Sequence, residues 1–307
     1  MAAYRANFGD LLEPGFRKIA FDSYKEIPGV REKVFTTYTM EHDSEKVSEI
    51  TGFGYPQETA EGGVVHYEDP VQGFDKTYAP KKWTLGFKVS REMVEDDRYN
   101  TIKKMPQALG RAFRRWEERD AAQVLNRAFN SSYLGSDSEE LCSTSHDRAD
   151  PTTGGVQSNA NSAGIILSET NLETGMLAMR GQLDDKGMRI VARAKLLLVP
   201  VELDKEAHEV IDSPYKQGTA DNDMNYYKGK FQIIDWDFMD RNATHWFLID
   251  PTLSTLSWYW RWRPRFAQDE TMDTDMAIYK MTARWANGWD NWRGVWGSQG
   301  DGASYSG

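Results

Sequence analysis

Alternating apolar and polar residues predict a strand at residues 82–90, where every second residue is large and apolar. The apolar set is Trp83, Leu85, Phe87 and Val89. A period of two is typical of a strand with one buried face. Glycine-punctuated, strand-like pieces precede it at 64–67 and 74–78. We therefore expect residues 46–90 to form a long, irregular β-hairpin with little core of its own.

A change to apolar steps of three and four residues predicts a long helix after residue 96. The apolar positions are Met105, Leu109, Ala112, Phe113, Trp116, Val124, Leu125, Ala128 and Phe129. Pro106 suits the first turn, where its missing amide donor is not needed, so the helix is expected over residues 106–129. Trp116 should lie on the buried face, and the charged residues should form a solvated face with local ion pairs.

Two segments are poor in residues that form a core. Residues 1–45 mix short apolar clusters with Pro14, Pro28 and several glycines, which predicts an extended arm carrying a short helix. Residues 131–164 are rich in Ser, Asn, Asp and Gly, which predicts a long surface loop. Cys142 lies in this loop and is expected to be a partly exposed thiol.

Helical periodicity returns after the polar loop. Thr170 and Glu173 have the spacing of a capping box, in which a hydroxyl and a carboxylate satisfy free backbone amides at a helix start. The helix is expected to run to about Leu183. Its inward-facing residues are expected to be Leu172, Met176, Leu177 and Met179.

The remaining second half predicts strands set against helices. Residues 184–187, with the sequence Asp-Asp-Lys-Gly, predict a turn, and residues 194–201 predict a buried strand followed by an acidic helix start. Two further strands are expected within residues 229–238 and 243–250. This half is therefore α+β, with helices against a mostly buried sheet.

Composition and charge narrow the function classes. Apolar residues make up 39% of the 307 residues, including 11 Trp, 14 Tyr and 13 Phe, which indicates a folded protein. The 37 basic and 47 acidic residues give a net charge of -10, which disfavours extended contact with nucleic-acid phosphates. The one concentration of arginine, at residues 111–119, is interleaved with acidic residues. The longest aliphatic stretch, residues 196–199, is too short to span a bilayer, so no membrane contact is expected.

Catalytic and metal-binding patterns are weak. Cys142 is the only cysteine, and the five histidines lack metal-ligand spacing, so no metal or cofactor is expected. A hydrolase using Cys142 near His146, or the adjacent Asp184 and Asp185, is a disfavoured alternative. Adjacent carboxylates rarely converge, and a loop without apolar anchors holds a nucleophile and its base poorly.

Tryptophan is concentrated near the end of the chain. The residues are Trp258, Trp260, Trp262, Trp285, Trp289, Trp292 and Trp296. Exposed in a row, they would form a sugar-binding platform, so a carbohydrate-binding virion surface module is an alternative function. Burial in a core or in a protein interface is the favoured interpretation.

Several stretches carry a resemblance by their order along nearly the whole chain. In the first half they are "AEGGVVHYED", "KVSREMVEDD" and "RAFRRWEERDAAQVLNRAF". In the second half they are "MLAMRGQLDDKG", "AKLLLVPVELDKEAHEVIDS", "ATHWFLID" and "WANGWDNWRGVWGS". In this order they resemble the major capsid proteins of tailed double-stranded-DNA bacteriophages, which have the Hong Kong 97-type fold.

The resemblance implies an α+β fold of Hong Kong 97 type and a structural protein, not an enzyme. The implied segments are an N-terminal arm at 1–45, an extended loop at 46–90, a peripheral domain with a spine helix at 91–164, an axial domain at 165–255, and peripheral return strands with the C-terminus at 256–307. The implied function is self-assembly into the icosahedral head shell that encloses the phage genome. The implied location is the virion, after assembly in the host cytoplasm.

The resemblance also implies contacts and partners. Contact candidates are Tyr55, Val64, Tyr67, Phe74, Tyr78 and Trp83 in the extended loop, Phe8 and Phe16 in the arm, and Arg111, Arg115 and Glu118 in the spine helix. The subunit is expected to form pentamers and hexamers with itself and to enclose double-stranded DNA without specific binding. A portal protein, a separate scaffolding protein, because no scaffolding segment precedes the arm, and optionally a decoration protein are the other expected partners. Some family members crosslink a loop lysine to an asparagine, but no motif here identifies such a pair.

Overall fold

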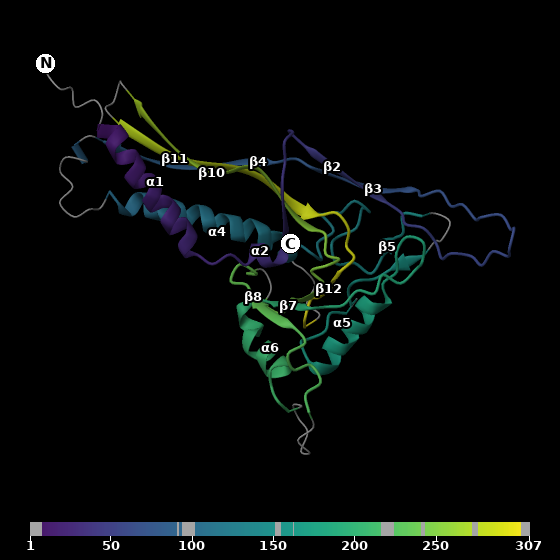
Figure 1. Ribbon diagram of the computed structural model, residues 1–307. Coiled ribbons are helices and arrows are strands. Elements are labelled where there is room, and N and C mark those ends of the chain that lie inside the picture. Colours follow the sequence, from purple (N-terminus) through teal and green to yellow (C-terminus); the bar gives the residue numbers. More distant parts are fainter. Residues whose placement is uncertain are drawn as a thin grey trace.

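The computed structural model describes residues 8–90, 92–93, 102–150, 155–161, 163–215, 224–240, 243–271 and 276–301, with side chains from residue 15 onward. Two four-stranded sheets, the helices packed on them and a projecting two-stranded ribbon make up most of this part of the chain (Figure 1). The mixed architecture confirms the predicted α+β class. No described helix is both long and apolar enough to cross a membrane.

The first sheet joins early and late parts of the chain. Its strands, in order across the sheet, are β1 (Thr36–Thr39), β10 (Leu256–Thr271), β11 (Met276–Trp289) and β4 (Lys81–Ser90). β1 runs parallel to β10, and the other neighbours are antiparallel. The strand predicted at 82–90 is confirmed as β4. However, β4 pairs with β11 along its length, so it belongs to this sheet and not to the extended hairpin.

Helices α1 (Phe8–Glu26) and α4 (Lys104–Asn126) cover one face of the first sheet, and the short α2 (Arg31–Val34) follows α1 (Figure 1). α4 confirms the predicted long helix with slightly shifted ends. Its predicted faces are partly wrong, because Trp116 is 36% exposed while Arg114 and Glu117 are buried. Contacts with α1 and α2 on that side of α4 decide which residues are buried.

The N-terminal segment differs from the expected extended arm. α1 has 19 residues, and its Phe16 and Ala20 are buried in the main hydrophobic core. Gly110 of α4 faces the backbone of α1, and a Cβ placed there would lie 2.0 Å from the carbonyl oxygen of Ala20. This close approach makes α1 an integral layer of the subunit.

Gly110→Ala is expected to lower the free energy of unfolding by roughly 1–3 kcal/mol, the usual cost of overpacking. The added methyl group would have to displace the α1 backbone, which cannot move aside like the end of a side chain. Gly15→Ala is the matched control, because nothing lies within 4 Å of its Cβ position. Alanine there should raise stability by roughly 0.5–1 kcal/mol through helix propensity. Denaturant unfolding measures both variants, and equal stabilities would contradict the close packing of α1 on α4.

The second sheet contains the buried strand that the aliphatic run predicts. Its strands, in order, are β12 (Val295–Ser298), β9 (Trp246–Ile249), β7 (Leu196–Val199) and β8 (Gln232–Asp235). β7 is parallel to β8 and antiparallel to β9, and every residue of β7 is buried. The helices of this part are α5 (Glu169–Gly181), the 3-10 turn η2 (Val201–Leu203) and α6 (Asp204–Ile211).

Two details of α5 correct the expectations, and one confirms them. The N-cap is Ser168, whose hydroxyl accepts from Asn171 N at 3.3 Å, so the cap at Thr170 is wrong. Leu177 is 61% exposed and does not face inward. The turn after the helix is confirmed, with Gly187 at a φ of 81°, in the left-handed region that favours glycine.

The ribbon consists of β2 (Glu45–Ile50) and β3 (Gln72–Tyr78), which pair antiparallel. It projects from the body on the side away from the long β10–β11 hairpin (Figure 1). Residues 51–71, here named the loop tip, connect its strands and contain no helix or strand. The predicted hairpin is therefore confirmed for β2 and β3 only.

Candidate functional site

The loop tip is closed at its base and open to solvent beyond. Thr51 N donates to Val71 O at 2.9 Å, and the Thr51 hydroxyl accepts from Val71 N at 2.9 Å. Farther out, Gly54 N donates to the carboxylate of Glu68 at 2.7 Å, which lowers the pKa of Glu68. These bonds hold the two sides of the tip together without any packed core.

The loop tip and its base expose several large apolar side chains. Tyr55, Val64 and Tyr67, all expected at subunit contacts, are 72%, 89% and 83% exposed. The other exposed apolar residues here are Ile50, Phe53, Val65 and Val71. A soluble monomer rarely leaves such a run of apolar side chains in water, so this surface has the character of a protein contact site.

Four other contact candidates are taken up inside their own subunit. Phe16, Tyr78 and Glu118 are buried. Tyr78 lies 4.6 Å from Tyr259, measured between ring centres, and its hydroxyl lies 2.5 Å from Asp290 Oδ1. Trp83 is half-buried in β4, where it contacts Trp116 and Trp285. For these residues the structure differs from the expectation, because packing within the subunit occupies their surfaces.

The remaining candidates lie at other places on the surface. Phe74 is half-buried on β3, and Arg115 is exposed on α4. Arg111 is also exposed, and its guanidinium lies 2.7 Å from the carboxylate of Glu26 on α1. Phe8 begins α1, but its side chain lies outside the described part of the chain.

Arg293 ties the base of the ribbon to the turn after α5. Its Nη2 lies 2.9 Å from Asp185 Oδ1, its Nη1 lies 3.5 Å from Glu49 Oε1, and its Nε donates to Leu183 O at 2.9 Å. Burial raises the pKa of Glu49, and the negative charge of Asp185 adds to the rise. Asp185 is therefore a structural ion-pair partner and not half of a catalytic carboxylate pair.

A buried ion cluster joins α4 to α1 and α2. Arg114 Nη1 lies 3.4 Å from Glu117 Oε2, and Arg114 Nη2 lies 3.4 Å from Glu118 Oε1. Tyr24 of α1 donates its hydroxyl to Glu117 Oε2 at 2.5 Å. The backbone N–H of Arg31 donates to Glu118 Oε2 at 3.0 Å. The prediction of a solvated charged face is wrong for these α4 residues.

Burial sets the protonation of this ion cluster. It raises the pKa of Glu117 to about 7, against the Tyr24 hydrogen bond and the positive charges of Arg31 and Arg114. It also lowers the pKa of Arg31, whose guanidinium carbon lies 4.6 Å from the ring centre of Trp258. Buried charges are tolerated only while each keeps its partners, so the cluster fixes the N-terminal segment on α4.

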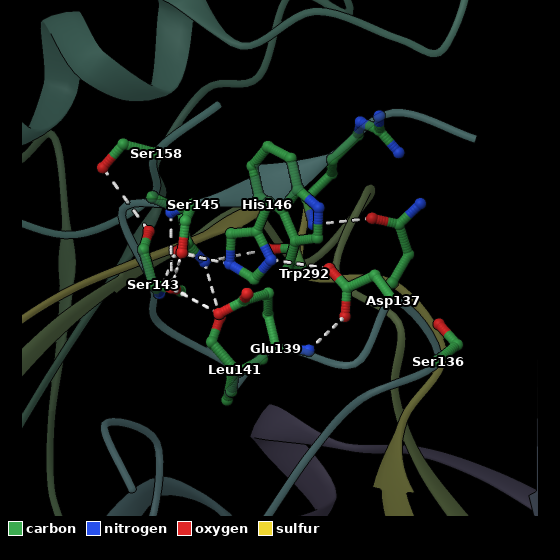
Figure 2. A network of polar contacts seen from close by, with 12 residues as sticks. Ser136, Asp137, Glu139, Leu141, Ser143, Ser145, His146, Ser158 and Trp292 are labelled. Carbon is green, nitrogen blue, oxygen red and sulfur yellow. Dashed lines mark hydrogen bonds and ion pairs between the residues drawn. The ribbon is translucent and has the colours of Figure 1, made fainter. Parts of the chain in front are cut away.

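The polar loop after α4 is packed, in contrast to the predicted surface loop. Its short strands β5 (His146–Asp147) and β6 (Val156–Gln157) pair, and His146 and Asn159 are buried. His146 Nδ1 lies 2.6 Å from Asp137 Oδ2, Nε2 lies 3.1 Å from Asn159 Oδ1, and the ring stacks on Trp292 at 4.4 Å (Figure 2). Polar side chains here bond to one another and replace an apolar core.

This geometry gives no support to a hydrolase. Both ring nitrogens of His146 are engaged, so the ring is not free to serve as a base for Cys142. The thiol is buried rather than partly exposed, and burial raises its pKa, whereas a nucleophilic cysteine needs a lowered one. No group of three or more potential ligands in the described chain could hold a metal ion.

The tryptophan tract forms core and not a sugar-binding platform. The buried members are Trp258, Trp260, Trp285, Trp289, Trp292 and Trp296. Trp258 stacks on Trp285 at 5.3 Å between ring centres, in the layer between the first sheet and the helices. Such side chains are not available to a ligand, so the favoured interpretation of burial is confirmed.

Comparisons with known proteins agree with this architecture. No curated protein matches the chain. The bacteriophage JBD30 capsid structure is similar with a TM-score of 0.56 and 16% identity, over 70% of this chain and 92% of that chain. A structure from Mycobacterium phage Patience has a TM-score of 0.56 and 11% identity, over 97% of this chain and 89% of that chain. A virus-like particle from Pyrococcus furiosus has a TM-score of 0.52 and 11% identity, over 93% and 98%.

Likeness at this low identity establishes the fold, which is of Hong Kong 97 type as expected. The family comes from the sequence, since the family described as phage capsid protein matches residues 74–298. This range includes both sheets apart from β1, together with α4 and the return strands. The chain therefore belongs to the phage capsid protein family, and it is a major capsid protein that forms the head shell.

Proposed function

We propose that subunits assemble as pentamers and hexamers of the shell and that the loop tip of each lies on a neighbouring subunit. The observation that carries this proposal is the run of exposed apolar side chains at residues 50–71. Apolar surface removed from water contributes about 25 cal/mol per Å². Repeated around a closed shell, even modest contacts of this kind become strong through multivalency.

The proposed domain roles follow the two sheets. The first sheet with α4 corresponds to the peripheral domain, expected at 91–164 and 256–307, and the second sheet to the axial domain, expected at 165–255. Two strands fall outside these boundaries: β4 joins the first sheet and β12 the second. We place residues 1–45 with the peripheral domain, because α1 packs on α4.

The proposed partners are a scaffolding protein, a portal protein and optionally a decoration protein, with assembly in the host cytoplasm. The JBD30 capsid, similar in fold, is decorated with minor capsid protein trimers, and a JBD30 procapsid is also similar. Double-stranded DNA is enclosed without specific binding, in keeping with the net charge of -10.

The triple variant Tyr55→Ser, Val64→Ser and Tyr67→Ser tests the loop assignment. It is expected to fold normally, since these side chains pack on nothing in their own subunit, and to give shells in at least about tenfold lower yield. Leu177→Ser, on the exposed face of α5, is the matched control for removing apolar surface. Negative-stain electron microscopy and thermal unfolding measure the two effects. Normal shells from the triple variant would refute the proposal.

A further inference from the structure

The face of the first sheet opposite the helices is basic. Residues directly opposite in register share a face of a sheet. Three such rows cross β4, β11 and, where it is paired, β10: Lys82 with Arg284 and Trp262, Thr84 with Thr282 and Arg265, and Gly86 with Lys280 and Ala267. A fourth row places Lys88 with Ile278 and Asp269. This surface, here named the basic face, has five cations and one acid.

The two faces of this sheet have different surroundings. The alternate residues face the helices, as the contacts of Tyr279 with Phe16 and of Trp83 with Trp116 demonstrate. α1 and α4 lie on that side only (Figure 1). Lys82, Lys88, Arg265 and Lys280 on the other side are all exposed, and Arg284 is half-buried.

The cations of the basic face are not neutralised within the described chain. None of the five forms an ion pair with a described residue, although Arg284 Nε donates to Pro80 O at 3.1 Å. Lysine and arginine at a subunit surface usually have acidic neighbours, especially in a chain with a net charge of -10. A concentrated positive surface on an acidic protein indicates an acidic partner.

The loop tip has the complementary charge. Residues 51–71 contain Glu58, Glu61, Glu68 and Asp69 and no lysine or arginine. Glu58, Glu61 and Asp69 are exposed. The same chain therefore carries an exposed, acidic and apolar loop and an exposed basic face that includes Trp262 and Ile278. Each surface has the chemistry that the other lacks.

The loop tip and the basic face of one subunit point away from each other. The ribbon leaves the body at one end, and the free end of the β10–β11 hairpin lies at the other (Figure 1). Only the base of the ribbon touches this sheet, where Tyr78 packs on Tyr259. A loop tip that reaches a basic face must therefore come from a second copy. Such a contact is head-to-tail, the type that closes into rings of subunits.

We propose that the acidic loop tip of one subunit docks on the basic face of the next. This inference rests on the proposed function, which places the loop tip on a neighbour, and it specifies where the loop lies and what holds it. Apolar side chains supply burial, and the charges set the register and the choice of partner.

A charge exchange tests this pairing in the full chain. Glu58→Lys with Glu61→Lys reverses the loop, and Lys88→Glu with Lys280→Glu reverses the face. Each double variant is expected to fold normally and to lower shell yield by about tenfold or more, because like charges then meet. The quadruple variant exchanges the two signs within every subunit and is expected to restore shells. Lys205→Glu, on the exposed surface of α6, is the control for a reversed cation elsewhere.

Normal shells from either double variant, or no recovery in the quadruple variant, would overturn the docking proposal. If the face variant forms normal shells that retain less DNA, the basic face serves the genome instead, and the proposal also fails. The serine triple variant separates the two levels. When that variant loses shells and the charge variants keep them, the loop still lies on a neighbour, but not on the basic face.

Discussion

Removal of residues 52–70, with Thr51 and Val71 joined by an Asn-Gly turn, is expected to leave a folded subunit that no longer forms shells. The hydrogen bonds between Thr51 and Val71 already bring the chain ends together, and a two-residue turn suits the hairpin. The deleted residues contribute nothing to the hydrophobic cores of the subunit. Thermal unfolding should therefore be nearly unchanged, while electron microscopy should find capsomers or free subunits only.

A second variant separates the length of the loop from its chemistry. Replacing residues 52–70 by a Gly-Ser linker of equal length keeps the connection but removes every apolar and acidic side chain of the tip. It is expected to fail in assembly as the deletion does. Normal shells from the deletion would mean that the loop tip has no role between subunits. Shells from the linker variant alone would mean that only chain length matters.

Arg114→Ala is expected to lower the free energy of unfolding by roughly 3–5 kcal/mol, the usual cost of removing one partner from a buried ion pair. The substitution leaves Glu117 and Glu118 buried without the guanidinium that lies 3.4 Å from each. It also loosens the junction of α4 with α1 and α2. Denaturant unfolding measures the loss.

Arg115→Ala is the control for this effect, because the residue is the next along the same helix and is exposed. It is expected to change stability by less than about 0.5 kcal/mol, as surface substitutions usually do. Equal effects of the two substitutions would contradict the ion cluster. A small effect of Arg114→Ala alone would mean that water or protonated carboxylates already satisfy the cluster.

The sequence predicts well the elements whose signal is local. The long helix, the aliphatic strand β7, the strands β8 and β9 and the turn ending at Gly187 each depend on periodicity or turn chemistry within about ten residues. The order of these elements also carries the resemblance that identifies the fold.

Elements decided by distant partners are predicted poorly. β4 reads as part of the hairpin, since its true partner, β11, lies almost two hundred residues later in the chain. The charges around Trp116 read as a solvated face, because the local pattern cannot reveal Tyr24 and Arg31, which approach from α1 and α2. Helix periodicity gives the faces of α4 but not which face is covered.

The polar loop shows the same limit in another form. A segment rich in Ser, Asn and Asp normally lies in solvent, since buried polar groups need partners. Here His146, Asn159 and Asp137 satisfy one another, and Trp292 from the far end of the chain covers the ring (Figure 2). Composition alone cannot distinguish a solvated polar segment from a satisfied polar network. The exposed contact residues of the loop tip, in contrast, were accessible from sequence because they need no partner within the subunit.

The most direct test of the central claim is a cryo-electron microscopy map of shells formed by the full chain. The account predicts that residues 51–71 of each subunit lie over the first sheet of the adjacent subunit, in contact with the row of Lys82, Lys280 and Arg265. A map in which this loop contacts only its own subunit, or extends into solvent, would contradict the account.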